Sequence, residues 1–163
     1  MINYKIEIKW AVRYSFILLI WMFVEKSIGL HDELIDKHAI YTNLFGIIAI
    51  IVYFFAIKDK KEHFFKNKMT WKEGFVSGIV LSVVIALLSP INQYIINTYI
   101  TPDYFKNVIA YVVENNRMTP ENAVGYFNLK SYMLQSAFGA LAMGVFTAAI
   151  VGYFLRSKDT KTN

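Results

Sequence analysis

The sequence contains no cysteine and few charged residues. Without cysteine the chain has no disulfides, no thiolate metal ligands and no cysteine nucleophile. Only 18% of its 163 residues are charged, whereas 56% are hydrophobic. This composition is too apolar for an ordinary soluble domain of this length and favours a protein that resides in lipid.

Sequence motifs for catalysis are also missing. There is no Walker-type glycine loop, zincin motif or serine-nucleophile elbow. Hydrolysis inside a membrane requires Ser with His, or two Asp, at membrane depth, but every His lies in or beside a connection and no Asp lies within an apolar run. The sequence therefore predicts no catalytic residues and no cofactor.

Four apolar runs are long enough to cross a hydrocarbon layer of about 30 Å, which takes about 20 helical residues. They cover residues 10–30, 39–57, 75–100 and 131–155, and the last two contain no charged residue. The first run also resembles a signal peptide, but three further runs follow it, which favours a span. We therefore predict an all-α membrane protein, one domain over residues 1–163, with four transmembrane helices.

The positive charges predict the orientation of these helices. They concentrate before the first run, between the second and third, and after the fourth: Lys5, Lys9, Arg13; Lys58, Lys60, Lys61, Lys66, Lys68, Lys72; Arg156, Lys158 and Lys161. Because Lys and Arg are retained on the cytoplasmic side, both termini and connection 58–74 should be cytoplasmic. This distribution accounts for the formal charge of +5, so we expect no nucleic-acid partner.

The cytoplasmic connection 58–74 alternates lysines with aromatic residues. We interpret its lysines as the signal that fixes membrane topology and its aromatic rings as anchors at the membrane interface. The alternative is a functional one, in which this connection docks lipid or a partner. Thr70 and Glu73 have capping-box spacing, so the third helix should begin inside this connection.

The outer connection 101–130 is the only extramembrane part large enough to fold. Residues 101–103 and 119–121 each read Thr-Pro-acid, which predicts two helix starts with a proline at the first helical position. Val108 and Val112 share an apolar face, so the first helix should lie on the membrane or over the bundle. The second could run straight into the fourth span.

Small residues recur every four positions in the last two spans, which allows close approach of helix backbones in lipid. These candidate packing residues are Gly74, Gly78, Ser82 and Ala86 in the third span and Ser136, Ala140, Gly144, Ala148 and Gly152 in the fourth. We predict one hairpin packed along both rows. The alternative is that one row serves a homo-oligomer.

Polar side chains gather in the outer halves of the same spans. Pro90 should kink the third span there, close to the amides Asn92, Gln93 and Asn97, and Gln135 lies at a comparable depth on the fourth span. We interpret these amides as hydrogen-bonding groups between helices, and the alternative is a small polar pocket.

The first outer connection contains residue types that bind divalent cations, namely His31, Asp32, Glu33, Asp36 and His38. Their spacing matches no specific metal motif, so we interpret them as a solvated acidic turn and predict no metal site. Glu25, at the end of the first run, is the best candidate for a buried acid.

Four segments resemble a family of bacterial membrane proteins catalogued as domain of unknown function 4199 (DUF4199). They are residues 56–59, 71–75, 102–105 and 126–132, and together with the small-residue fourth span the resemblance covers nearly the whole chain. The resemblance implies the four-span architecture in a bacterial cytoplasmic membrane. It implies no activity and no functional residues.

Taken together, the sequence favours a noncatalytic four-helix bundle that acts through interaction with membrane lipid or with another membrane protein. One alternative is a small transporter or channel subunit that works as a homo-oligomer, with Asn92, Gln93, Asn97 and Gln135 lining its path. A less favoured alternative is an intramembrane lipid-modifying enzyme that requires Glu25.

Overall fold

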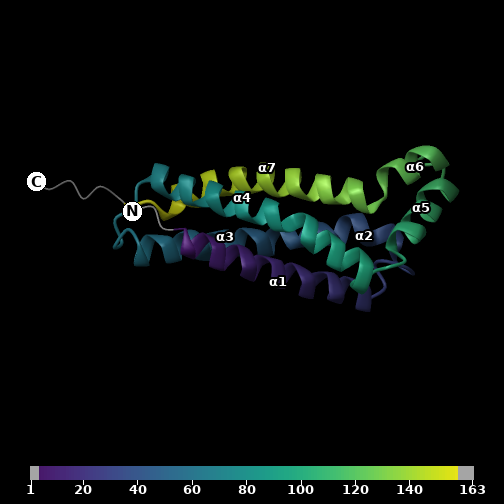
Figure 1. The fold of residues 1–163 in the computed structure, drawn as a ribbon, viewed down its shortest axis with the longest axis horizontal. Helices are drawn as coiled ribbons and strands as arrows, with labels where there is room; N and C mark the ends of the chain where they lie inside the picture. Colours follow the sequence, from purple (N-terminus) through teal and green to yellow (C-terminus); the bar gives the residue numbers. More distant parts are fainter. Residues whose placement is uncertain (1–3, 158–163) are drawn as a thin grey trace, which may run out of the picture.

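The structure, a computed structural model, describes residues 4–157, and every regular element within them is a helix (Figure 1). The helices are α1 (Lys5–Ser27), α2 (Ile35–Tyr41), α3 (Phe45–His63), α4 (Trp71–Ile95), α5 (Tyr104–Glu114), α6 (Pro120–Tyr126) and α7 (Leu129–Leu155). A 3-10 turn, Thr42–Leu44, joins α2 to α3, and a π-helical turn, Ile96–Ile100, extends α4. The all-α prediction is therefore confirmed.

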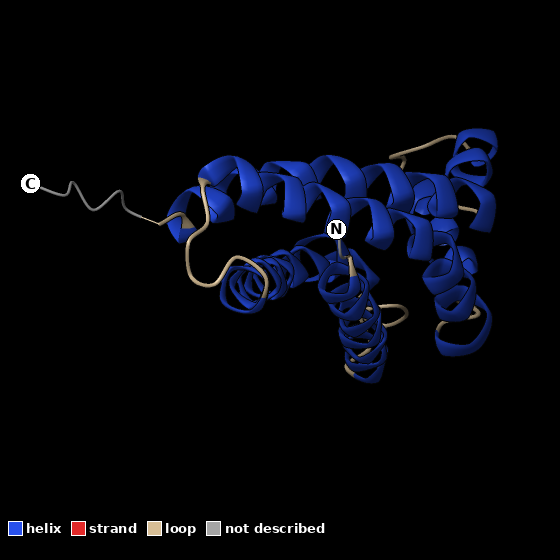
Figure 2. Cartoon of the chain, turned by 60° about the vertical axis from the view of Figure 1, so that its left-hand side comes forward, coloured by secondary structure: helices blue, strands red, loops and turns tan. Residues whose placement is uncertain are grey.

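The long helices α1, α3, α4 and α7 run along the long axis of the molecule, and α5 and α6 cover one end of them (Figure 1). We call this the cap end. At the opposite end α1 and α4 begin and α3 and α7 end, and the lysines of residues 58–72 lie there, so we call it the lysine-rich end. Figure 2 shows the same helices from another side, joined only by loops.

Three helical segments are long and apolar enough to cross a membrane. They are Ile35–His63, Trp71–Ile100 and Leu129–Leu155, which contain the predicted spans 39–57, 75–100 and 131–155. The predicted first span, 10–30, is not among them, because α1 carries charged residues near both ends. The helix also ends at Ser27, so residues 28–30 belong to the following turn.

Large apolar side chains cover the outside of the long helices. Phe16, Leu87, Phe138 and Phe154 are between 63% and 76% exposed. A soluble monomer rarely displays so much apolar surface, whereas lipid solvates it without cost. The described part of the chain is therefore compatible with a membrane protein.

The small residues of α4 and α7 lie against one another in antiparallel register. A Cβ atom built on Gly78 would lie 2.3 Å from that of Ala148, and one built on Gly74 would lie 3.3 Å from the Cα of Gly152. Among the helices of residues 4–157, no other pair is in such extensive contact. Only small residues allow the two backbones to approach this closely.

The connection at the lysine-rich end is shorter than residues 58–74, because α3 continues to His63. The first lysines of the predicted connection therefore lie on the last turns of α3. The capping box is confirmed: the Thr70 hydroxyl accepts from the Glu73 amide at 3.3 Å, and the Thr70 amide donates to the Glu73 carboxylate at 2.7 Å.

The cap end corrects two details of the predicted outer connection. Helix α5 begins at Tyr104, not at Pro102, because Thr101 is buried and its amide donates to the Ile96 carbonyl at 2.7 Å, which extends the preceding turn. Helix α6 begins at Pro120 with Thr119 as its cap, as predicted. However, α6 does not run into the last span, since Asn128 caps a separate helix, α7.

The apolar face of α5 is buried as its pattern predicts. Val108 and Val112 form a small core with Tyr104 and with Ala123 of α6. This core holds the cap together and places Tyr104 over the end of α1, where the candidate site lies.

Candidate functional site

Glu25 lies on the last full turn of α1, and the chain reverses directly after it. Gly29 has a φ of +82°, a left-handed conformation that suits glycine, and the Leu30 amide donates to the Glu25 carbonyl at 3.0 Å. This tight helix end carries His31 back beneath the Glu25 side chain.

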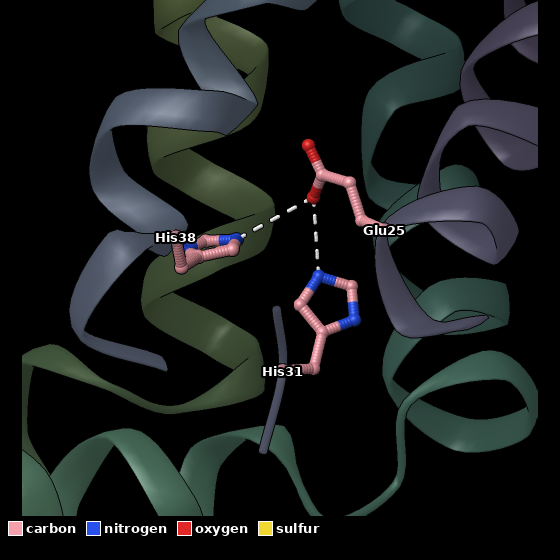
Figure 3. Close-up of side chains that lie close together, drawn as sticks. All are labelled: Glu25, His31 and His38. Carbon is pink, nitrogen blue, oxygen red and sulfur yellow. Dashed lines mark hydrogen bonds and ion pairs between the residues drawn. The ribbon is translucent and has the colours of Figure 1, made fainter. Parts of the chain in front are cut away.

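Two histidines converge on one oxygen of Glu25 (Figure 3). His31 Nε2 lies 3.1 Å from Glu25 Oε2, and Nε2 of His38, which α2 supplies, lies 3.6 Å from the same oxygen. We call these three residues the Glu–His cluster. Its members come from the end of α1, the following turn and the next helix, so the site forms within a single short stretch of chain.

The surroundings of the cluster hold each side chain in place. Trp21 Nε1 donates to the other carboxylate oxygen of Glu25, Oε1, which leaves Oε2 facing the histidines. The Tyr104 hydroxyl lies 3.5 Å from His38 Nδ1 and 3.1 Å from the Tyr132 hydroxyl. Burial raises the pKa of the Tyr104 hydroxyl above its ordinary value, so this group remains protonated and able to donate.

The cluster is largely shielded from solvent but not sealed. The side chains of Glu25, His31 and His38 are 1%, 4% and 16% exposed. The buried Nδ1 atom of His31, on the far side of the ring from Glu25, has no hydrogen-bond partner (Figure 3). A cavity of about 50 Å³ adjoins His31 and is also lined by Asp32 and Asp103.

The prediction that this turn is solvated is correct for its acidic residues and wrong for its histidines. Asp32, Glu33 and Asp36 are exposed, but His31 is buried and His38 is only partly exposed. The prediction that Glu25 is buried is confirmed. The turn residue Gly29, between an acid and two histidines, was the signal that could have connected them.

The amide side chains of the predicted polar pocket make separate contacts in the structure. Asn92 is buried and donates to Ser15 of α1 at 2.9 Å, while Asn97 donates to Gln93 at 3.0 Å within the same helix. Gln135 lies exposed on α7. A transport path along these amides stays a prediction.

A second polar cluster lies buried at the lysine-rich end, and the sequence did not indicate it. Lys60 of α3 contacts Glu7 of α1 at 2.9 Å, and Ser77 of α4 donates to the same Glu7 oxygen at 2.7 Å. All three residues are at most 5% exposed. The ion pair joins α1 to α3, and the Ser77 hydrogen bond adds α4.

A pocket of about 410 Å³ opens next to this ion pair. Its lining is mainly apolar, with charged side chains at the floor and the rim: Tyr4, Glu7, Lys60, Phe64, Phe65, Lys72, Glu73, Val76, Ser77 and Val80. We call it the lysine-end pocket. Since Glu7 pairs with Lys60 and Glu73 caps Thr70, the exposed Lys72 is the charge at its rim.

The fold defines an all-helical protein with apolar helices suited to a membrane. The model of the family described as protein of unknown function (DUF4199) matches residues 9–157, so the chain belongs to this family, as its sequence segments indicated. No curated protein and no solved structure matches the chain.

Proposed function

We propose that this chain is a noncatalytic, four-span protein of a bacterial cytoplasmic membrane that binds an anionic phospholipid of the inner leaflet in the lysine-end pocket. Both termini and the lysine-rich end are then cytoplasmic. The observation that carries the proposal is the pocket itself, an apolar cavity with a lysine at its rim, at the most basic end of the molecule.

The fourth span in this proposal is α1. Its 23 residues extend about 35 Å at 1.5 Å per residue, enough to cross the hydrocarbon layer. Its acids Glu7 and Glu25 point into the protein and are buried, whereas Phe16 and Ile20 are 63% and 65% exposed. The two acids that lower the hydropathy of α1 are thus hidden from lipid, while its exposed cations, Lys5, Lys9, Arg13 and Lys26, lie toward the two ends, where long side chains reach the headgroups.

The chemistry of the pocket favours a phospholipid over a soluble ligand. Val76, Val80 and Phe65 offer an apolar wall for an acyl chain, and Lys72 offers a cation for a phosphate at the membrane surface. Lysines at such a surface attract anionic lipid with about 1 kcal/mol each. The volume also lies within the roughly 300–1,000 Å³ typical of small-ligand pockets.

Native mass spectrometry of the full chain, stripped of lipid and titrated with phosphatidylglycerol or phosphatidylethanolamine, tests the proposal. We expect preferential retention of the anionic phosphatidylglycerol. Lys72→Gln should lower that retention about fivefold, the equivalent of about 1 kcal/mol. Val76→Trp, which fills the pocket, should lower the retention of both lipids.

Lys130→Gln is the matched control, because this exposed lysine lies at the cap end. Its retention of phosphatidylglycerol should equal that of the unmodified chain. Equal retention of the two lipids, or the same loss in Lys72→Gln and Lys130→Gln, would overturn the proposal.

A further inference from the structure

We propose that the Glu–His cluster binds one divalent transition metal ion of the zinc class, with Glu25, His31 and His38 as its protein ligands. This inference is independent of the lipid site, which lies at the opposite end of the molecule. It is carried by the convergence of three ligand atoms, all within 4.8 Å of one another, in a largely buried site.

The spacing of the ligand atoms fits tetrahedral coordination. Zinc–nitrogen and zinc–oxygen bonds of about 2.0–2.2 Å place two tetrahedral ligand atoms about 3.4 Å apart. The two distances from Glu25 Oε2, 3.1 Å to His31 Nε2 and 3.6 Å to His38 Nε2, lie on either side of this value. The two histidine nitrogens lie within 4.8 Å of each other, so rotation of the side chains would bring all three atoms to bonding distance from one ion.

The ligand types select the class of metal. Two imidazole nitrogens with one carboxylate are typical of zinc and related transition metals, whereas calcium and magnesium prefer oxygen ligands alone. Three protein ligands leave a fourth position for water or an exogenous ligand, as in open zinc sites.

The groups around the three ligands resemble the supporting contacts of a metal site. Trp21 fixes the carboxylate through Oε1, and the Tyr104 hydroxyl lies beside the non-ligating nitrogen of His38. Such contacts orient metal ligands and set their tautomers. The corresponding nitrogen of His31, Nδ1, is buried without a partner and lies in a residue that lines the 50 Å³ cavity, which is large enough for water.

The same cavity offers a route for the ion. Asp32 and Asp103 line it, and both are exposed, so a cation meets carboxylates before it reaches His31. Lys26 also lines the cavity and partly offsets this attraction.

The test uses the purified full chain in detergent, treated with chelator and then titrated with Zn²⁺ by calorimetry, with bound metal measured by mass spectrometry. We expect one Zn²⁺ per chain. His31→Gln and His38→Gln should each weaken binding more than about 100-fold, because each removes a ligand, whereas Tyr104→Phe should weaken it about 10-fold.

The control variant is His63→Gln. His63 is the third and last histidine of the chain, and it lies exposed near Asp59 at the lysine-rich end. Binding by His63→Gln should equal that of the unmodified chain, which separates the cluster from adventitious histidine binding. Helical content measured by circular dichroism identifies any variant that fails to fold.

Co²⁺ supplies a second, spectroscopic readout. Bound in the cluster it should give the visible absorption of a four-coordinate site and quench the fluorescence of Trp21, whose indole nitrogen donates to Glu25. Absence of stoichiometric Zn²⁺ binding, or binding that survives replacement of both His31 and His38, would overturn the inference.

Discussion

At the scale of residues, the two buried acids of α1 have different partners. Glu25 faces two histidines that lie close to it in sequence, whereas Glu7 pairs with Lys60, which comes from α3 and lies more than fifty residues away. A buried charge that loses its partner is strongly destabilising, but an apolar replacement of the whole pair is often tolerated. The Glu7–Lys60 pair is therefore open to a direct test.

We expect Lys60→Met to destabilise the chain by about 3–5 kcal/mol, because Glu7 would remain buried without its cation. The double variant Glu7→Leu with Lys60→Met should recover most of this loss. Chemical denaturation in detergent, followed by circular dichroism, measures both. The ion pair has no such role if the double variant loses as much stability as Glu7→Leu and Lys60→Met lose in sum when made singly.

At the scale of elements, the contact between α4 and α7 depends on the absence of side chains. Gly78 lies against Ala148, Gly74 against Gly152, and Gly144 against Ser82, so the rows meet residue by residue along the helices. Since lipid gives little hydrophobic force between helices, this close packing supplies much of their association.

Substitution of one glycine in the row should separate the two helices. Gly78→Ala places a Cβ atom 2.3 Å from that of Ala148, far closer than two carbon atoms can approach. We expect it to destabilise the chain by about 1–3 kcal/mol through overpacking. Thermal unfolding in detergent measures the change.

Gly139→Ala is the control, on the facing helix α7. No atom lies within 4 Å of a Cβ atom at this position, so the added methyl group meets no neighbour. This variant should be neutral or more stable by about 0.4–1 kcal/mol. Equal destabilisation by Gly78→Ala and Gly139→Ala would show that helix contact is not the cause.

At the scale of the whole molecule, the two ends differ in charge and in structure. At the lysine-rich end, most of the cations lie in the stretch from Lys58 to Lys72. The cap end carries α5, α6 and the Glu–His cluster. Helices α1 and α4 begin, and α3 and α7 end, at the same end of the molecule, which fits four antiparallel spans. Lys158 and Lys161, which contributed to the predicted orientation, lie outside the described residues.

Accessibility of single introduced cysteines tests this orientation, since the native chain has none. Cysteines at positions 66 and 163 should react with membrane-impermeant maleimide only after the inner membrane is permeabilised, and a cysteine at position 116 should react in intact spheroplasts. A reactive position 66 in intact spheroplasts would reverse the proposed orientation. A cysteine at position 116 that reacts only after permeabilisation would also reverse it.

The sequence by itself determined the class of the protein and most of its helices. Long uncharged runs have no stable form in lipid other than a helix, and Thr70 with Glu73, or Thr119 with Pro120, start helices through contacts within one turn. The start of α5 was misplaced because the Thr101 amide bonds to Ile96 of the preceding helix turn, in competition with the local Thr-Pro signal.

Only the tertiary structure decided which residues come together in the two buried clusters. The contact of Glu7 with Lys60 and Ser77 joins three helices, and no periodicity in one helix encodes which residue of another will face it. Glu25, His31 and His38 are close in sequence, but their convergence depends on the left-handed turn at Gly29 and on the cover provided by Tyr104 of α5. Helix formation is local, whereas burial of these charges depends on side chains that a turn or another helix brings to them.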